Sequence, residues 1–158
     1  MKISTAIALL AVLFSLEAHA EDKATLSFSE LHGDKQEAVS IDHWKGKPLL
    51  VAFWRSDCAP CLQEMKLLPE IAKDNSDLNI ALISLHDVEH TRSHLPDLPE
   101  NVHTLVANDD GKKVLASFGN DRTLALPYSI MLNKNGDVCG KHYGIVSPNQ
   151  VKEWRKEC

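Results

Sequence analysis

The strongest constraint on the fold is a continuous apolar segment that leads directly into a Cys-x-x-Cys motif. Residues 48–54 (PLLVAFW) combine β-branched, aliphatic and aromatic side chains, which is typical of a strand buried on both faces of a sheet. Residues 59–73 then carry apolar side chains at three- and four-residue spacings, which predicts an amphipathic helix. Cys58 and Cys61 therefore lie where a buried strand passes into a helix. The apolar stripe of that helix consists of Leu62, Met65, Leu68, Ile71 and Ala72.

The rest of the chain alternates between strand and helix patterns. Strand and helix segments in this order predict an α/β fold with a mixed sheet. The sequence NKNGD between two apolar segments is a strong hairpin signal. Ser147 followed by Pro148 is typical of the start of a helix. The expected elements are short strands and turns within 24–47, strands at 78–85 and 102–108, about two helical turns after residue 86, a short helix ending at Gly119, a hairpin from 127–132 and 138–144, and a helix over 147–158.

Size and charge exclude several functional classes. A chain of 158 residues has room for one domain with a substantial core. Its formal net charge of -5 and its lack of basic clusters argue against nucleic-acid binding, which needs a positive surface. No glycine-rich phosphate-binding loop is present, and we expect no cofactor.

The first twenty residues have the pattern of a secretory signal peptide. Lys2 is followed by the apolar residues 3–16 and by Ala-His-Ala at 18–20, a small-x-small cleavage site. We therefore expect cleavage near Ala20, a single mature domain over 21–158, and export to the periplasm. The apolar segment is short for a membrane span, although a retained anchor is the alternative. In an oxidising compartment, four cysteines favour disulfide chemistry.

The setting of the Cys-x-x-Cys motif favours redox chemistry over zinc binding. A structural zinc site needs a second pair of ligands at matching spacing, which Cys139 and Cys158 do not provide. A thiolate at Cys58 would be stabilised by the start of the helix, and the thiolate is the form that attacks disulfides. Cys61 is then placed to resolve the mixed disulfide. Pro60 is tolerated within the first helical turn because no amide hydrogen is needed there.

Four stretches resemble a known family. They are WKGKPLLVAFW before the motif, the glutamate three residues after Cys61, LPYSIMLNKNGDV, and GIVSPNQVKEW. Together, over about residues 26–156, they are similar to exported TlpA/ResA-type thiol-disulfide oxidoreductases of the thioredoxin superfamily. The resemblance implies a thioredoxin fold: a central mixed β-sheet flanked by helices, with an N-terminal β extension and a strand-helix insertion.

The resemblance also implies roles for particular residues. In thioredoxin folds a cis proline faces the dithiol, and the residue before it pairs with the substrate. Here those residues would be Pro127 and Leu126. Ala59 and Pro60, next to Cys58, would support substrate binding together with Trp54. Apart from the resemblance, the simplest interpretation of the tryptophans is Trp44 in the core, Trp54 at the rim of the active site and Trp154 packing on the last helix.

Three positions depart from the family pattern. Asp57 stands beside the first cysteine, where its carboxylate would raise the thiol pKa or, alternatively, cap the helix. Ala52 replaces the buried acid of plain thioredoxins, so Glu64 becomes a candidate for proton transfer, the alternative being a solvated helix residue. Lys66 replaces a proline that often kinks this helix, which predicts a straighter helix.

The second cysteine pair can be joined by simple geometry. From Cys139 the extended chain travels about 17 Å to residue 144, at about 3.3 Å per residue. The helix from 147 returns about 16 Å at about 1.5 Å per residue, which brings Cys158 back beside Cys139. We expect a structural disulfide between them; two free thiols or an intermolecular bridge are the alternatives.

Three histidines recur every four residues. His86, His90 and His94 would share one face if a single helix carried them, as a zinc or copper site requires. Surface histidines are the commoner explanation, and we assign no metal to them.

The expected function is reduction of disulfides in exported proteins through Cys58 and Cys61. The resemblance implies cytochrome c or metal-site assembly proteins as substrates and a membrane thiol-electron donor of the DsbD/CcdA type. The alternatives are a periplasmic dithiol oxidase or isomerase, a copper-binding chaperone that uses the same thiols, and a purely structural disulfide.

Overall fold

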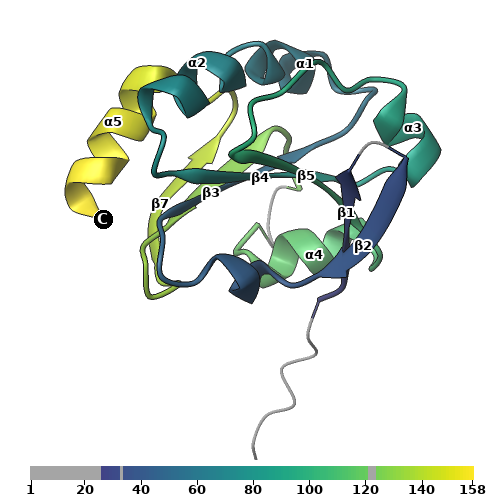
Figure 1. Ribbon diagram of the computed structural model, residues 1–158, viewed down its shortest axis with the longest axis horizontal. Coiled ribbons are helices and arrows are strands. Elements are labelled where there is room, and N and C mark those ends of the chain that lie inside the picture. Colours follow the sequence, from purple (N-terminus) through teal and green to yellow (C-terminus); the bar gives the residue numbers. More distant parts are fainter. Residues whose placement is uncertain (1–25, 33, 121–123) are drawn as a thin grey trace, which may run out of the picture.

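The computed structural model describes residues 26–32, 34–120 and 124–158. The expected signal peptide, residues 1–20, and its cleavage site lie outside this part of the chain. A seven-stranded mixed sheet in the order β2-β1-β5-β4-β3-β6-β7 forms the centre of the molecule (Figure 1). The elements are β1 (Phe28–His32), β2 (Lys35–Val39), a 3-10 helix η1 (Ile41–Trp44), β3 (Leu49–Trp54), α1 (Ala59–Met65), α2 (Leu68–Asp74), β4 (Asn79–Ser84), α3 (Val88–Arg92), β5 (Val102–Ala107), α4 (Gly111–Ser117), β6 (Tyr128–Leu132), β7 (Val138–Tyr143) and α5 (Pro148–Glu157).

Strand β3 is buried along its whole length, as its sequence predicts. It pairs in parallel with β4 and antiparallel with β6. Its even-numbered side chains pack with α1, α2 and α5, and its odd-numbered side chains pack with α4. Figure 1 shows these helices on opposite sides of the sheet. A strand covered on both faces has no solvent-facing side, which explains the unbroken apolar run.

The remaining topology matches the thioredoxin fold with both expected additions. The β1–β2 hairpin is the N-terminal extension, and β1 pairs antiparallel with β5. Strand β5 and helix α4 are inserted between β4 and the β6–β7 hairpin, and β5 runs parallel to β4. Among the described residues, no helix has the length and apolar character needed to cross a membrane.

The helix after the cysteine motif is broken, contrary to the straight helix expected from Lys66. Helix α1 ends at Met65 and α2 begins at Leu68. Around the break, the amides of Lys66 and Leu67 bond to the carbonyls three residues back, in 3-10 fashion. Pro69 explains this, because a proline cannot donate to the carbonyl four residues back and its ring clashes with that carbonyl, here of Met65.

The C-terminal helix α5 has a capped start, and a disulfide and a tryptophan–glycine contact join it to the sheet. Ser147 caps α5 by accepting a hydrogen bond from the Gln150 amide. The structure has the disulfide expected between Cys139 on β7 and Cys158, with their Cα atoms 5.6 Å apart. Trp154 lies directly on Gly140, where a Cβ atom would come within 2.6 Å of the indole ring. The sheet and α5 are therefore in close contact beside the disulfide.

Candidate active site

The two cysteines of the motif occupy different environments at the start of α1. Cys58 is the N-cap residue and is partly exposed, whereas Cys61 is 1% exposed. They form a disulfide with Cα atoms 5.2 Å apart. The Cys61 amide donates a hydrogen bond to the Cys58 sulfur over 3.3 Å. An attacking thiol needs access and a resolving thiol does not, so the geometry fits the roles expected from the sequence.

The Leu126–Pro127 peptide bond is cis, as the resemblance implies. Strand β6 begins one residue later, with Tyr128 opposite Phe53 on β3. Pro127 thus lies at the same end of the sheet as the end of β3, from which the chain continues to Cys58. Leu126 is partly buried and packs against the same apolar cluster as Cys58.

Glu64 is buried under the motif, so the alternative of a solvated helix residue is wrong. Its side chain accepts hydrogen bonds from the Ser129 hydroxyl (3.1 Å) and from the Val146 amide (2.9 Å). Burial raises the pKa of Glu64 to about 7, although both hydrogen bonds favour the carboxylate. A buried carboxyl with this pKa can accept or release a proton near neutral pH.

This glutamate lies in the region that a buried acid at position 52 would occupy. Ala52 on β3 is paired in register with Ser129 on β6, and paired side chains point to the same face of a sheet. Because Ser129 donates to Glu64, the carboxyl group reaches this face from α1 instead of from β3. The helix supplies the acid that the strand lacks.

Asp57 does not cap the helix, because Cys58 occupies the N-cap position. Its carboxylate accepts two hydrogen bonds from Arg55, at 2.8 and 2.9 Å. The Arg55 hydrogen bond, and to a lesser degree its charge and that of His86, hold the pKa of Asp57 below its usual value. The carboxylate is therefore ionised beside Cys58, but a guanidinium offsets part of its field.

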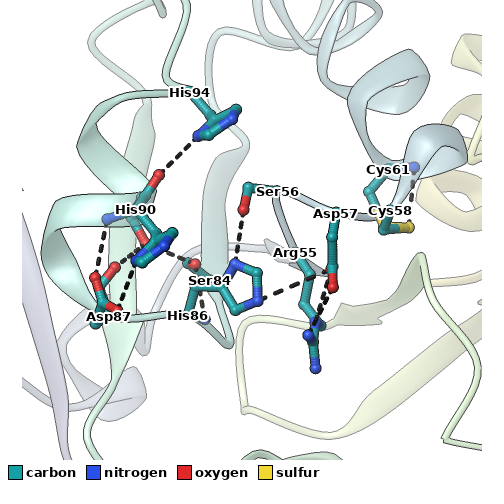
Figure 2. A network of polar contacts seen from close by, with 11 residues as sticks. Arg55, Ser56, Asp57, Cys58, Cys61, Ser84, His86, Asp87, His90 and His94 are labelled. Carbon is teal, nitrogen blue, oxygen red and sulfur yellow. Dashed lines mark hydrogen bonds and ion pairs between the residues drawn. A yellow bond between two sulfur atoms is a disulfide. The ribbon is translucent and has the colours of Figure 1, made fainter.

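Figure 2 shows a polar network between this loop and α3 that the sequence analysis missed. His86 Nδ1 lies 2.7 Å from the Ser56 hydroxyl, and His86 Nε2 lies 3.8 Å from Asp57 Oδ1. The register of β3 and β4 contains the signal: Trp54 pairs with Ser84, so two residues further Ser56 meets His86. Arg55 could have been found as a cation two residues before Asp57.

The three histidines are not arranged as a set of metal ligands. Helix α3 covers only Val88–Arg92, so His86 precedes it and His94 follows it. The imidazoles of His86 and His90 lie 5.7 Å apart, while Nδ1 of the His94 ring contacts the His90 carbonyl and the Ser93 hydroxyl. Within the described part of the chain, no three His, Cys, Asp or Glu side chains are grouped to hold a metal ion.

Three further predicted residues surround the motif in different ways. Trp54 is 1% exposed and packs in the core with Cys61, so it supports the site from beneath and is not a rim residue. Ala59 and Pro60 are exposed in the first turn of α1. They flank Cys58 on the side open to solvent.

The fold and the site together define a thioredoxin-like thiol-disulfide oxidoreductase. The class is recognised by a Cys-x-x-Cys pair at a strand-to-helix junction, with a cis proline at the same end of the sheet. Residues 19–156 match the Redoxin family, and the chain belongs to that family.

Comparisons with known proteins agree with this assignment. The chain is 25% identical over 131 residues to the thiol-disulfide oxidoreductase ResA of Bacillus thuringiensis subsp. konkukian, covering 82% of this chain and 72% of that protein. The exposed lipoprotein thioredoxin of Streptococcus pneumoniae has a similar structure, with a TM-score of 0.65, 22% identity, and coverage of 82% of this chain and 98% of that one. A secreted Mycobacterium tuberculosis disulfide oxidoreductase homologous to Escherichia coli DsbE gives a TM-score of 0.61 at 17% identity, with coverage of 78% and 90%.

Proposed function

We propose that this chain is exported and reduces disulfide bonds in extracytoplasmic proteins through the Cys58–Cys61 dithiol. The observation that carries the proposal is the asymmetry of the pair, with a partly exposed cysteine at the helix cap and a buried one in the first turn of the helix. A structural disulfide needs no such difference. A reversible dithiol does, since one thiol has to meet the substrate and the other has to release it.

The reaction begins with the reduced dithiol and balances in two displacements. The Cys58 thiolate attacks one sulfur of the substrate disulfide, forming a mixed disulfide and expelling the other sulfur as a thiolate that takes up a proton. Cys61 then loses its proton and attacks the Cys58 sulfur. This step forms the Cys58–Cys61 disulfide and releases the second substrate thiol. Two electrons and two protons pass to the substrate, and a dithiol donor must restore the starting state.

Glu64 is proposed as the acceptor of the Cys61 proton. Both side chains are buried, they lie one helical turn apart on α1, and water has little access to either. With its pKa raised to about 7, the Glu64 carboxyl holds and releases a proton at the pH of the reaction. The pair is thus suited to the resolving step.

Limited stabilisation of the Cys58 thiolate supports the proposed reducing direction. Helix α1 has only seven residues, and the sulfur accepts one backbone hydrogen bond, from Cys61. The Asp57 carboxylate opposes a second negative charge nearby. A thiolate that is weakly stabilised favours the disulfide form and hence a low reduction potential.

Export and partners are proposed on related grounds. Residues 1–20 have a signal-peptide pattern, and two similar structures are described as a secreted protein and an exposed lipoprotein. Oxidised cytochrome c precursors or metal-site assembly proteins would be the substrates. A membrane thiol donor of the DsbD/CcdA type would return the electrons.

Two measurements test this function together. The reduced protein should precipitate insulin by cleaving its interchain disulfides, and the Cys58→Ala variant should not. Equilibration with glutathione buffers should give a potential near that of thioredoxin, about −270 mV. A potential near about −120 mV, the value of the oxidant DsbA, together with refolding of a scrambled substrate, would instead show an oxidase or isomerase.

A further inference from the structure

His86 is built into the loop that carries the attacking cysteine. It follows β4 by two residues, and its amide donates to the Ser84 hydroxyl over 3.1 Å. Its ring crosses to the neighbouring strand end, where Nδ1 is 2.7 Å from the Ser56 hydroxyl and Nε2 points towards Asp57. The ring thus links the end of β4 to the two residues that precede Cys58.

Among the charged groups around the His86 ring, Asp57 is the one with which a protonated ring would interact. On the β3–α1 loop, Asp57 faces Nε2 at 3.8 Å and is itself paired with Arg55. On the α3 side, the His90 ring lies 5.7 Å away, but its Nδ1 is paired with Asp87 at 2.8 Å. The carboxylate beside Cys58 is therefore the anion towards which His86 is directed.

We propose that His86 is a positioning residue of the redox site: it holds the loop through Ser56, and its protonation offsets the Asp57 carboxylate beside Cys58. When Nδ1 carries no proton the Ser56 hydroxyl donates to it, and when Nδ1 is protonated it donates to Ser56, so the link is retained in both cases. Imidazole changes its charge between pH 5 and 8, the range in which thiolates of such motifs form. The reactivity of Cys58 is thereby kept high in mildly acidic surroundings.

The size of the effect follows from the charge that is added or lost. A cation near a thiolate shifts the thiol pKa by roughly half to one unit at a partly exposed site. Below that pKa, this corresponds to about a threefold to tenfold change in the thiolate fraction. Because histidine side chains generally lose their charge between pH 5 and 8, the effect should be smaller at pH 8 than at pH 5.5.

The test measures the rate at which iodoacetamide alkylates Cys58 in the reduced full-length protein, from pH 5 to pH 8.5, with the site identified by mass spectrometry. In His86→Gln the rate should fall about threefold to tenfold at pH 5.5 and by less than twofold at pH 8. His90→Gln is the matched control, since among the described residues that ring pairs with Asp87 and forms no hydrogen bond or ion pair with the loop, and its profile should follow the wild type. His86→Lys supplies a permanent cation and should keep the wild-type rate at pH 5.5, even if glutamine disturbs the loop.

Three results would overturn the inference: identical profiles for wild type and His86→Gln, an equal loss in His90→Gln, or a His86→Lys protein as slow as His86→Gln. The inference rests on Cys58 as the attacking thiol of the proposed function. Alkylation needs no protein substrate, so failure to reduce insulin with an intact His86 effect would refute only the proposed function. A wild-type Cys58 no more reactive than an ordinary thiol would refute both.

Discussion

Replacing Glu64 with glutamine should change how the stability of this protein depends on pH. The carboxyl is buried, with a pKa raised from 4.5 to about 7 by loss of hydration. Between these two pH values the unfolded chain releases the proton while the folded protein keeps it. The folded state then binds more protons, so the free energy of unfolding falls as the pH rises. Each pH unit contributes about 1.36 kcal/mol, so the loss between pH 4.5 and pH 8 is about 3 kcal/mol.

The assay is urea denaturation of the oxidised protein at several pH values between 4 and 8.5. Glutamine has nearly the shape of glutamate, and its amide can still accept from Val146 and donate to Ser129. The Glu64→Gln variant keeps every other titrating group, so the difference between the two proteins isolates this carboxyl. The variant should be about 3 kcal/mol less sensitive to the change from pH 4.5 to pH 8. Parallel stability curves for the two proteins would refute the reasoning.

Three further predictions concern the second disulfide, its neighbour and the charge beside Cys58. Replacing both Cys139 and Cys158 with alanine should lower the free energy of unfolding, measured in urea, by about 3 kcal/mol, because the disulfide restricts the unfolded chain. Insulin reduction should remain intact. Unchanged stability would contradict this prediction. Gly140→Ala should cost about 1–3 kcal/mol by the same measurement, since a Cβ there meets an indole ring at 2.6 Å, and an unaffected midpoint would be the opposing result. Asp57→Asn should lower the pKa of the Cys58 thiol by roughly half to one unit, measured from the thiolate absorbance at 240 nm. A higher thiol pKa in the variant would show instead that the carboxylate stabilises the Cys58 thiolate.

The sequence predicts the fold well because its strongest signals are local. The apolar residues 48–54 leave no solvent-facing side for the strand, and the NKNGD turn specifies the hairpin of β6 and β7. The prediction of a straight helix from Lys66 is wrong because Pro69, three residues further along the chain, interrupts the helix.

The site was predicted less completely because its polar contacts join distant segments. The cysteine pair and the cis bond at Pro127 follow from recognisable motifs. The burial of Glu64 depends on Ser129 and Val146, 65 and 82 residues away, so the sequence left its environment open. The contact of Ser56 with His86 could have been inferred only by extending the register of two parallel strands beyond their ends.

The central claim is that Cys58 is the reactive sulfur and Cys61 the protected one. Brief treatment of the reduced protein with limiting iodoacetamide at pH 6, followed by peptide mass spectrometry, measures this difference directly. The structure predicts modification of Cys58 well before Cys61, at a rate above that of glutathione under the same conditions. Equal labelling of the two cysteines, at or below the glutathione rate, would contradict the account.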